Sequence, residues 1–499
     1  MKCLYITQEY APHFVEGGLG LASRAMPAAL QTRHGMTHDL VLPAYPWLLA
    51  RSGLRTAEIC RLPGRSVGGV TSAATVLRLL DHGGPCEVIL IRADAWYDRD
   101  GIYRDAMYAE FADAVERSAF FGACVADWIE QTGAAYELVH ANDWQSGAAL
   151  AHVRSRRTGS APALLMNIHS AVYEGRLPLP APQADTADGL GLPEKAVARL
   201  RNRAPGGESM LALGLLSADA AVTCSPSYAR EIPAIHAKSP VADLWADMDH
   251  TGIVSGVDDT VWNPAIPGRP SAPFDADTVD EGKRLNKSAL QRRLGLGQNP
   301  EAPVVGVCSR FVDEKGTDLL LAALVPLLAE ESAQVVLMGP GEEPFRAELA
   351  HLADRHPHRL AYLPQFDQEL AWLVYAGSDL TVMPSRVEPC GLNQLIAMAY
   401  GTLPVVCPVG GLRDTVVSAD RGDGTGWIIP AHTSQAVLET VRSALSLLRH
   451  QPAEATAMRR RAMAQDWSWT RTADEFARLY LRLTARPDVP VSASRQERI

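Results

Sequence analysis

Residues 304–316 read VVGVCSRFVDEKG, an apolar run of strand length followed by a charged loop. The residues at 304–308 predict a buried strand, and the pattern at 318–329 predicts the helix that follows it. The same alternation of short apolar runs and longer helical patterns recurs along almost the whole chain. We predict strands at residues 2–7, 87–91, 138–140, 163–168, 220–223, 304–308, 334–338, 380–383 and 403–406, and helices at residues 113–131, 318–329, 344–356 and 393–400. Such alternation is typical of right-handed βαβ units, so the predicted fold class is α/β with mainly parallel sheets.

Two series of strand–helix units are present, one before about residue 255 and one after about residue 300. Residues 263–273, NPAIPGRPSAP, are rich in proline and small residues and predict a linker between the two series. A second stretch typical of loops spans residues 177–207. We therefore expect two doubly wound, Rossmann-like domains facing a central cleft, with ligands at the carboxyl ends of the strands.

The composition excludes several classes of protein. The chain has 499 residues, 47% apolar and 21% charged, as expected for a globular protein with a sizeable core. Its 47 basic and 57 acidic residues give a net charge of −10, which argues against nucleic acid or an anionic membrane as the main partner. The eight cysteines are scattered without a C-x-x-C pair, which favours reduced thiols in a cytoplasmic protein over a zinc or disulfide framework. The longest apolar stretch, residues 319–329, is much shorter than the roughly 20 residues of a membrane span.

A glycine-rich turn follows the first predicted strand. Gly17 and Gly18 precede a helical pattern, and glycines there allow backbone N–H groups to approach a phosphate at a helix N-terminus. The same residues would also serve a tight strand-to-helix turn that binds nothing. Both interpretations of this turn remain open at the level of sequence.

Two cations follow the strand at 304–308. Arg310 and Lys315 lie five residues apart on the loop and could together bind a diphosphate leaving group. A solvated charged loop is the alternative. The chain has only six lysines beside 41 arginines, so a lysine at a strand end favours the functional interpretation.

A carboxylate follows the strand at 380–383. Residues 384–394, PSRVEPCGLNQ, open a helix, and Glu388 would stand at the cleft in a position to bind sugar hydroxyls. The N–H groups of Gly391 to Asn393 would be free to hold phosphate oxygens, because first-turn amides have no partner within a helix. A plain helix cap is the alternative.

Two histidines end strands of the first series. His140 and His169 come from the stretches HANDWQ at 140–145 and NIHS at 167–170. A single histidine is usually structural, but two at successive strand ends are better candidates for a site. We favour His169.

These motifs together resemble the bacterial glycogen and starch synthases, which are retaining glycosyltransferases of the GT-B fold. The resemblance extends from Lys2 to about Leu483 and rests on several ordered blocks. The blocks are residues 17–19, 140–144, 168–169, 225–232, 256–258, 261–264, 309–310, 315–316, 384–392, 410–412, 414–416 and 466–469.

The resemblance implies a domain division. It predicts an N-terminal sugar and acceptor domain at residues 1–262, with a C-terminal helix at about 468–488 that packs back onto it. Residues 263–300 would form a linker and lead-in segment, and residues 301–467 the C-terminal domain that binds the nucleotide sugar.

The resemblance also implies roles for individual residues. Arg310 and Lys315 would bind the nucleotide's phosphates, Glu388 would hold the donor sugar, and His169 would contact that sugar and steady an oxocarbenium-like transition state. The remaining donor-binding residues would be Gly17, Gly18, Phe366, Cys390, Gly391, Leu392 and Asn393, with Phe366 stacking on the base. No metal and no other cofactor are implied, since protein cations take the place of a metal in GT-B enzymes.

Departures from the family pattern cluster on the side of the sugar and the acceptor. Val15 stands where the family has lysine, Leu21 where an acidic residue is usual, and Ser170 and Ser255 where asparagines are usual. Together with Asp143, these residues would line the sugar and acceptor pocket. A site with polar groups that bind hydroxyls disfavours a ligand without those hydroxyls, because the polar groups would stay unpaired. The loss of such polar residues here therefore predicts a donor sugar with different hydroxyls.

Three hypotheses follow. The first is a glycosyltransferase that moves a modified sugar or a cyclitol from a nucleotide diphosphate to a malto-oligosaccharide-like acceptor, as in the biosynthesis of acarbose-type pseudo-oligosaccharides. The second is an ordinary glycogen synthase that uses ADP-glucose. The third is a catalytically silent relative that binds a glycan or a nucleotide. The expected partners are a nucleotide-sugar donor and an oligosaccharide acceptor, without nucleic acid or membrane.

Overall fold

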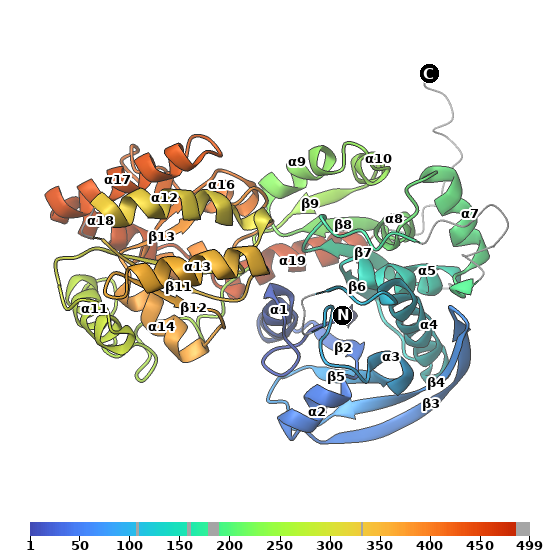
Figure 1. Cartoon of the computed structure of the whole chain (residues 1–499). Coiled ribbons are helices and arrows are strands. Elements are labelled where there is room, and N and C mark those ends of the chain that lie inside the picture. The colour runs from blue at the N-terminus through green and yellow to red at the C-terminus, as the bar shows by residue number, and fades with distance from the viewer. Residues whose placement is uncertain (106–108, 157–160, 178–188, 331–332, 486–499) are drawn as a thin grey trace. The chain divides into compact units, whose positions relative to one another are not determined.

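The computed structural model describes residues 1–105, 109–156, 161–177, 189–330 and 333–485. It divides the chain into two compact units. Unit 1 comprises Met1–Thr223, Ala229–Ile253 and the described part of Trp469–Ile499, and unit 2 comprises Cys224–Tyr228 and Val254–Ser468. Elements of both units are labelled in Figure 1 where there is room.

The described residues of unit 1 form a nine-stranded sheet in the order β3-β4-β5-β2-β1-β6-β7-β8-β9. All pairs are parallel except β3 with β4 and β4 with β5. The strands are β1 Lys2–Ile6, β2 Thr37–Pro43, β3 Thr56–Val67, β4 Val70–Leu79, β5 Glu87–Arg92, β6 Leu138–Asn142, β7 Ala163–Ile168, β8 Ala220–Thr223 and β9 His250–Gly252. β1 lies between β2 and β6, so the direction of winding reverses between β1 and β6, where ligands of open α/β sheets bind.

The helices of unit 1 follow its parallel strands. They are α1 Gly18–His34, α2 Pro46–Ser52, α3 Asp94–Tyr97, α4 Ala114–Thr132, α5 Gly147–Ser155, α7 Glu194–Arg203, α8 Met210–Ser217, α9 Pro226–Ile235, α10 Val241–Asp247 and α19 Trp469–Thr484. Of α9, residues 229–235 belong to unit 1. α1 and α4 each end at a glycine in the left-handed region, Gly35 and Gly133, where a side chain would be strained.

The last helix, α19, packs within unit 1. It contacts α1, and Asp474 pairs with Arg33 at 2.6 Å and with His34 at 2.8 Å. The hydroxyl of Tyr480 lies 2.7 Å from Nδ1 of the buried His140 on β6. α19 thus contacts both α1 and β6 of unit 1.

The described residues of unit 2 form a six-stranded parallel sheet in the order β12-β11-β10-β13-β14-β15. The strands are β10 Val304–Cys308, β11 Gln334–Met338, β12 Leu360–Leu363, β13 Leu380–Met383, β14 Leu403–Val406 and β15 Trp427–Ile428. The helices are α11 Val279–Leu294, α12 Thr317–Glu330, α13 Glu343–Arg355, α14 Gln368–Gly377, α15 Asn393–Ala399, α16 Gly410–Thr415, α17 Ser434–His450 and α18 Pro452–Met463. This is the doubly wound order, and its switch point lies between β10 and β13.

Two segments differ from their sequence-based descriptions. Residues 263–300 lie within unit 2, because α11 contacts α14 and because Phe274, Val279 and Leu290 are part of the unit 2 core. The stretch 177–207, predicted as a loop, contains α7, whose apolar Val197 and Leu200 are buried. Residues 178–188 of that stretch lie outside the described residues.

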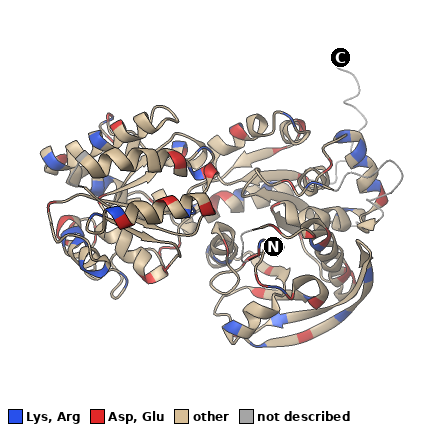
Figure 2. Cartoon of the chain, viewed as in Figure 1, with Lys and Arg blue, Asp and Glu red and all other residues tan. Residues whose placement is uncertain are grey.

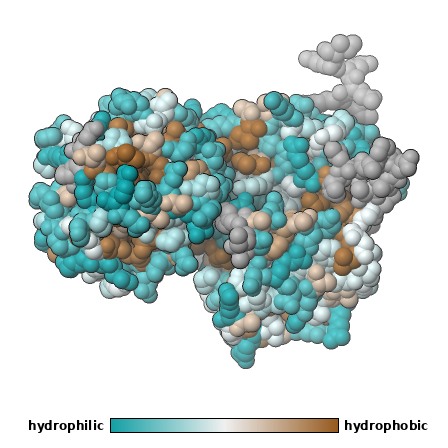
Figure 3. Space-filling model, in the orientation of Figure 1, coloured by the Kyte–Doolittle hydropathy of each residue, from teal (hydrophilic) through white to brown (hydrophobic). Residues whose placement is uncertain are grey.

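Charged residues of both signs are interspersed on the helices of each unit (Figure 2). On the face drawn in Figure 3, hydrophilic residues cover most of the described surface and apolar residues gather in small patches. Among the described residues, no helix is both long enough and apolar enough to cross a membrane.

Candidate active site

Lys315 and Glu388 meet at the switch point of unit 2. Lys315 ends a short 3-10 turn, Asp313–Lys315, that follows β10, and Glu388 lies on the loop that follows β13. The ammonium of Lys315 donates to both carboxylate oxygens of Glu388, at 2.8 and 2.7 Å. The hydroxyl of Ser385 donates to the same carboxylate at 3.1 Å. Glu388 is 6% exposed, so a cation is held on a nearly buried carboxylate at the edge where ligands bind.

Arg310 lines a pocket with Lys315. Ser309 and Ser385 line the same pocket, between the ends of β10 and β13. The guanidinium of Arg310 donates to Glu314 at 2.5 Å, on its own loop. The structure thus brings together the two cations and the carboxylate that the sequence suggested.

Glycines allow the loops of this site to approach closely. Gly316 has a φ of +67°, and a Cβ there would lie 2.2 Å from the carbonyl oxygen of Pro384. Gly410 has a φ of +44°, and a Cβ there would lie 1.9 Å from the carbonyl oxygen of Glu388. Since real Cβ atoms do not approach oxygen so closely, both positions require glycine.

The segment after Glu388 leads into α15. Gly391 has a φ of +71°, Leu392 is the N-cap, and Asn393 begins the helix. The side-chain amide of Asn393 donates to the carbonyl of Cys308 at the end of β10. This bond ties the helix to the strand beside it and does not involve the backbone N–H of Asn393, whose contact with the donor stays a prediction.

Cys390 and Ser255 lie together in unit 2. The thiol of Cys390 is 4.0 Å from the carbonyl oxygen of Ser255, and burial raises the pKa of Cys390 to about 12. Ser255 was grouped by sequence with Val15, Leu21, Asp143 and Ser170, all of which lie in unit 1. Ser255 lies in unit 2, and its place in the sugar and acceptor pocket stays a prediction.

Phe366 lies on the loop between β12 and α14 and is 54% exposed. Among the described residues, it is not one of those that line the pocket of Arg310 and Lys315. Its role as a base-stacking residue stays a prediction.

Two further blocks that carry the resemblance also meet in unit 2. Asp414 on α16 accepts from the backbone amide and the hydroxyl of Ser227 at 2.7 and 2.6 Å. The hydroxyl of Ser225 donates to the carbonyl of Pro389 at 2.6 Å. These contacts support the loop that carries Glu388.

In unit 1, Asp143 organises the ends of β6 and β7. One carboxylate oxygen accepts from the amide of His169 at 2.7 Å and from that of Ser170 at 3.3 Å. Asp143 has a φ of +54°, a strained value for a residue other than glycine. Burial raises the pKa of Asp143 to about 7, although the two backbone N–H groups act in the opposite direction.

His169 is held on a polar network. Its Nε2 lies 2.9 Å from Oδ1 of Asn142 and 3.1 Å from Nδ2 of Asn167. Burial lowers the pKa of His169 to about 4, so the imidazole is neutral at neutral pH. It can exchange hydrogen bonds with a sugar hydroxyl, but it does not act as a cation there.

The glycine turn of unit 1 already holds a carboxylate. Glu9, which follows β1, accepts from the amides of Glu16 and Gly17 at 2.8 Å each and from the hydroxyl of Tyr103 at 2.9 Å. Glu9 is 2% exposed, and burial raises its pKa despite these donors. The Gly17 amide is therefore bonded to the chain itself, and its binding to the donor stays a prediction. Gly18 begins α1, and first-turn amides have no acceptor within the helix.

Val15 and Leu21 flank that turn. The side chain of Val15 is 41% exposed, and Leu21 is partly buried in the first turns of α1. Neither can supply the charge that the family places at its position.

Glu9 was missed by reasoning from the sequence. A carboxylate directly after the first strand, eight residues before a glycine, was the available signal. Among the described residues, no group of three His, Cys, Asp or Glu side chains is placed to hold a metal ion.

Comparison with known proteins identifies the family. The family described as "Starch synthase catalytic domain" matches residues 2–243, and "Glycosyl transferases group 1" matches residues 292–461. The glycogen synthase of Nitrosospira multiformis is 35% identical over 502 residues, which cover 97% of each chain. The glycogen synthase of Anaeromyxobacter dehalogenans is 36% identical over 97% of this chain and 99% of its own.

A solved structure shares the fold. The catalytic domain of starch synthase IV from Arabidopsis thaliana, bound to ADP and acarbose, matches with a TM-score of 0.85 and 24% identity. The match covers 97% of this chain and 99% of that domain, so the GT-B fold extends over nearly the full length. With sequence relatives of the same extent, the chain belongs to the bacterial glycogen synthase family of GT-B glycosyltransferases.

Proposed function

We propose that this chain is a retaining glycosyltransferase that moves a glucosyl unit from ADP-glucose to a malto-oligosaccharide or glycogen chain. The observation that carries the proposal is the Lys315–Glu388 pair at the switch point of unit 2, in a chain related end to end to glycogen synthases. The relative bound to ADP and acarbose supports an adenine nucleotide and an acceptor of glucan type.

Arg310 and Lys315 bind the diphosphate of the donor. When the bond between the sugar C1 and the diphosphate oxygen breaks, the electron pair leaves with the diphosphate, whose growing charge these cations stabilise. The acceptor hydroxyl oxygen forms the new bond to C1, on the face that the diphosphate leaves, and its proton departs with the diphosphate. Because Glu388 holds Lys315 with both oxygens, the ammonium needs little reorganisation during the reaction.

The residues of unit 1 bind the sugar side. Neutral His169 hydrogen-bonds a hydroxyl of the transferred sugar, and Asp143 fixes the backbone that carries it. Gly18, at the start of α1, offers its amide to a phosphate oxygen, while Gly17 remains bonded to Glu9. We assign the stabilisation of charge to the protein's own cations and propose that no metal takes part.

The test is a transfer assay with ADP-glucose and UDP-glucose as donors and maltotriose as acceptor, with NMR of the new linkage to read retention. Glu388→Gln and Lys315→Ala should each lower turnover by more than about 100-fold, comparable to the loss of one preorganised donor in a transition state. Glu281→Gln, which breaks an exposed ion pair on α11, and Lys195→Ala, at an exposed lysine, are the matched controls. Near-normal rates in both site variants would overturn the assignment.

A second candidate function is transfer of a modified sugar, as in pseudo-oligosaccharide biosynthesis. The observation in its favour is the exposed, uncharged side chain of Val15 at a position where the family has lysine. A deoxy- or amino-sugar donor used faster than ADP-glucose would support it, whereas efficient transfer from ADP-glucose would end it. Tight nucleotide binding without turnover of any donor would indicate a silent relative.

A further inference from the structure

The loop that follows β7 begins with His169, and contacts at both of its ends hold it in place. At its start, Asp143 accepts a hydrogen bond from the amide of His169 at 2.7 Å. Toward its end, the carbonyl oxygens of Glu174 and Gly175 accept from two amides in the first turn of α8, at 3.0 and 2.9 Å. The place of His169 therefore depends on residues that lie several positions further along the loop.

A buried pair of side chains also holds the end of this loop. Oε1 of Glu174 lies 2.9 Å from Nδ1 of His236, the residue after α9. Since a carboxylate only accepts hydrogen bonds, Nδ1 of His236 donates. Glu174 is 9% exposed and His236 is 4% exposed. Oε2 of Glu174 and Nε2 of His236 are buried without hydrogen-bond partners, so among the described residues each side chain has only the other as such a partner.

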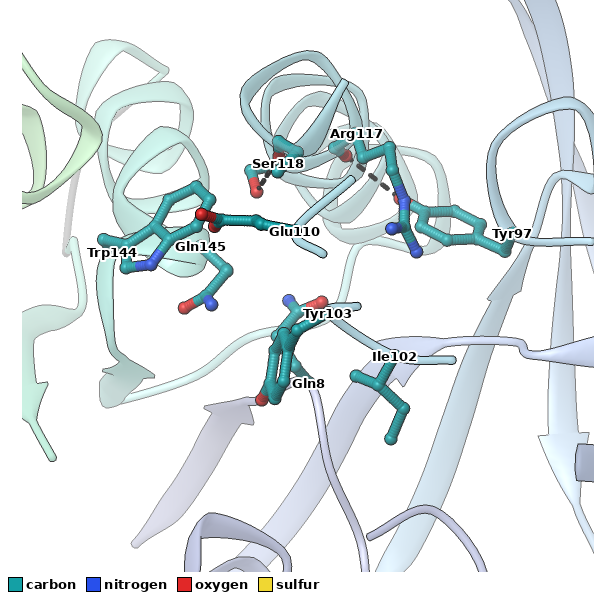
Figure 4. Close-up of a pocket in the computed structure, with 10 residues that line it drawn as sticks. Gln8, Tyr97, Ile102, Tyr103, Glu110, Arg117, Ser118, Trp144 and Gln145 are labelled. Atoms are coloured by element: carbon teal, nitrogen blue, oxygen red, sulfur yellow. Dashed lines mark hydrogen bonds between the residues drawn. The ribbon is translucent and has the colours of Figure 1, made fainter. Parts of the chain in front are cut away.

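A close approach at Gly175 connects the end of the loop to Asp143. Gly175 has a φ of +58°, and a Cβ there would lie 2.1 Å from Cε3 of Trp144. Trp144 directly follows Asp143 on the turn after β6, and Figure 4 shows its indole, which lines a small pocket of unit 1. Because no side chain fits between Gly175 and the indole, a shift of the loop end would displace Trp144, and with it the carboxylate that holds His169.

We propose that Glu174 and His236 are positioning residues for His169. The inference rests on the proposed function, in which His169 hydrogen-bonds a hydroxyl of the transferred sugar. The pair acts through the backbone of the loop and through Trp144, and it makes no contact with the substrate itself.

The chemistry of the pair fits positioning better than stabilisation. Taking two polar side chains out of water costs free energy that their attraction only partly offsets, so a buried pair adds little to stability. The hydrogen bond between carboxylate and imidazole is directional, however, and a position of the loop that breaks it would leave a buried carboxylate unpaired. The pair therefore disfavours other positions of the loop.

Single variants test whether the hydrogen bond matters. Glu174→Met and His236→Leu remove it, and each should lower kcat for transfer from ADP-glucose to maltotriose at least about tenfold, because small displacements of a binding group are costly in rate. Glu174→Gln keeps an acceptor and His236→Asn keeps a donor, so both should retain kcat within about threefold. The affinity for ADP should stay the same in all four variants, because the proposed phosphate-binding cations lie in unit 2.

The double variant Glu174→Met/His236→Leu separates positioning from stability. It replaces both partners by apolar side chains, so it should recover most of the melting temperature that each single variant loses. Its kcat should stay at least about tenfold low, because apolar contacts supply no directional bond. His34→Leu is the matched control, since it removes a histidine of unit 1 that pairs with Asp474 at 2.8 Å and does not hold this loop. It should keep the kcat of the wild type.

The ring NMR signal of His169, in protein made with isotope-labelled histidine and assigned by its loss in His169→Asn, gives a readout independent of turnover. It should move in Glu174→Met and in the double variant, and not in His34→Leu. If the wild type transfers no sugar from ADP-glucose, the proposed function fails, and this signal still decides the inference. A kcat that recovers with the melting temperature in the double variant, a kcat unchanged in both disruptive single variants, or a His169 signal that does not move would each overturn it.

Discussion

In the Lys315–Glu388 ion pair, the carboxylate is more deeply buried than the ammonium. The carboxylate side chain of Glu388 is 7% exposed and that of Lys315 is 19% exposed, so each charge depends on the other for compensation. Removal of one partner from such a pair leaves an uncompensated buried charge, which costs more than the pair itself contributes.

This asymmetry predicts a non-additive double-mutant cycle. Lys315→Ala should lower the free energy of unfolding by about 3 kcal/mol, because Glu388 would be left charged and unpaired. The double variant Lys315→Ala/Glu388→Gln should recover part of that loss while it stays inactive. Urea unfolding and transfer assays on the four proteins measure the cycle, and additive losses of stability would contradict it.

Asp143 predicts a pH dependence of the transfer rate. Its pKa of about 7 means that the carboxylate becomes charged as the pH rises through neutrality, and its bonds to the amides of His169 and Ser170 then become charge-assisted. The rate should therefore rise with pH around pH 7. His169 should add no titration in that range, because its pKa is about 4.

Asp143→Asn measures this effect. The amide keeps an oxygen for both N–H groups but does not titrate, so the rise around pH 7 should disappear from the rate profile. A profile identical to that of the wild type would assign the rise to another group.

At the scale of elements, the loop between β10 and α12 depends on Gly316. Gly316→Ala would place a methyl group 2.2 Å from the carbonyl of Pro384, in addition to the strain of a positive φ. Gly295, which ends α11, has a φ of +69° with no atom within 4 Å of its virtual Cβ. It supplies the same backbone strain without the clash.

We therefore expect Gly316→Ala to lower the melting temperature more than Gly295→Ala, whose cost should be about 1 kcal/mol. The transfer rate should fall in Gly316→Ala alone, because displacement of the loop moves Lys315 away from Glu388. Equal effects of the two substitutions on stability and rate would show that close approach at Pro384 is unimportant.

Some strands were predicted from the local sequence pattern, and others were not. The strands with uniformly buried residues, such as β10 and β13, coincide with the predicted apolar runs. The hairpin of β3 and β4 was not predicted, because most residues of β3 are exposed and give no clear alternation. Its strand character comes from pairing with β4, a contact that a local pattern does not encode.

At the scale of the whole molecule, unit 1 contains buried neutral histidines. Burial lowers the pKa of His38 and His152 to about 4 and that of the fully buried His140 well below its usual range. Since the unfolded chain binds these protons at about pH 6.5, their contribution to stability is complete above that pH and is lost as the pH falls toward 4. Each histidine should cost about 2 kcal/mol by pH 5.

The double variant His38→Asn/His152→Asn isolates this contribution. Between pH 7.5 and pH 5, its free energy of unfolding should fall by about 4 kcal/mol less than that of the wild type. His351→Asn, at an exposed histidine of α13, should follow the wild type. Parallel loss of stability in all three proteins, measured by urea unfolding at each pH, would refute the prediction.

The amino-acid sequence by itself determined the α/β class, most of the buried strands, and the identity of the charged residues at strand ends. These features are local in sequence. An apolar run of five residues, or a lysine after it, can be recognised without knowing which residues surround it in the folded protein. The Lys315 and Glu388 motifs were found in this way, although the two residues are 73 positions apart.

Only the tertiary structure decided which of these groups meet. In the structure, Lys315 donates to both carboxylate oxygens of Glu388, and the Gly17 amide donates to Glu9. Ser255 lies beside Cys390, and Nε of Arg117 is buried without a hydrogen-bond partner. The reason is that such contacts depend on the order of parallel strands and on close approaches at glycine, which act between residues distant in sequence. The amino-acid sequence shows which residues are charged, and the packing of the sheets determines which residues they contact.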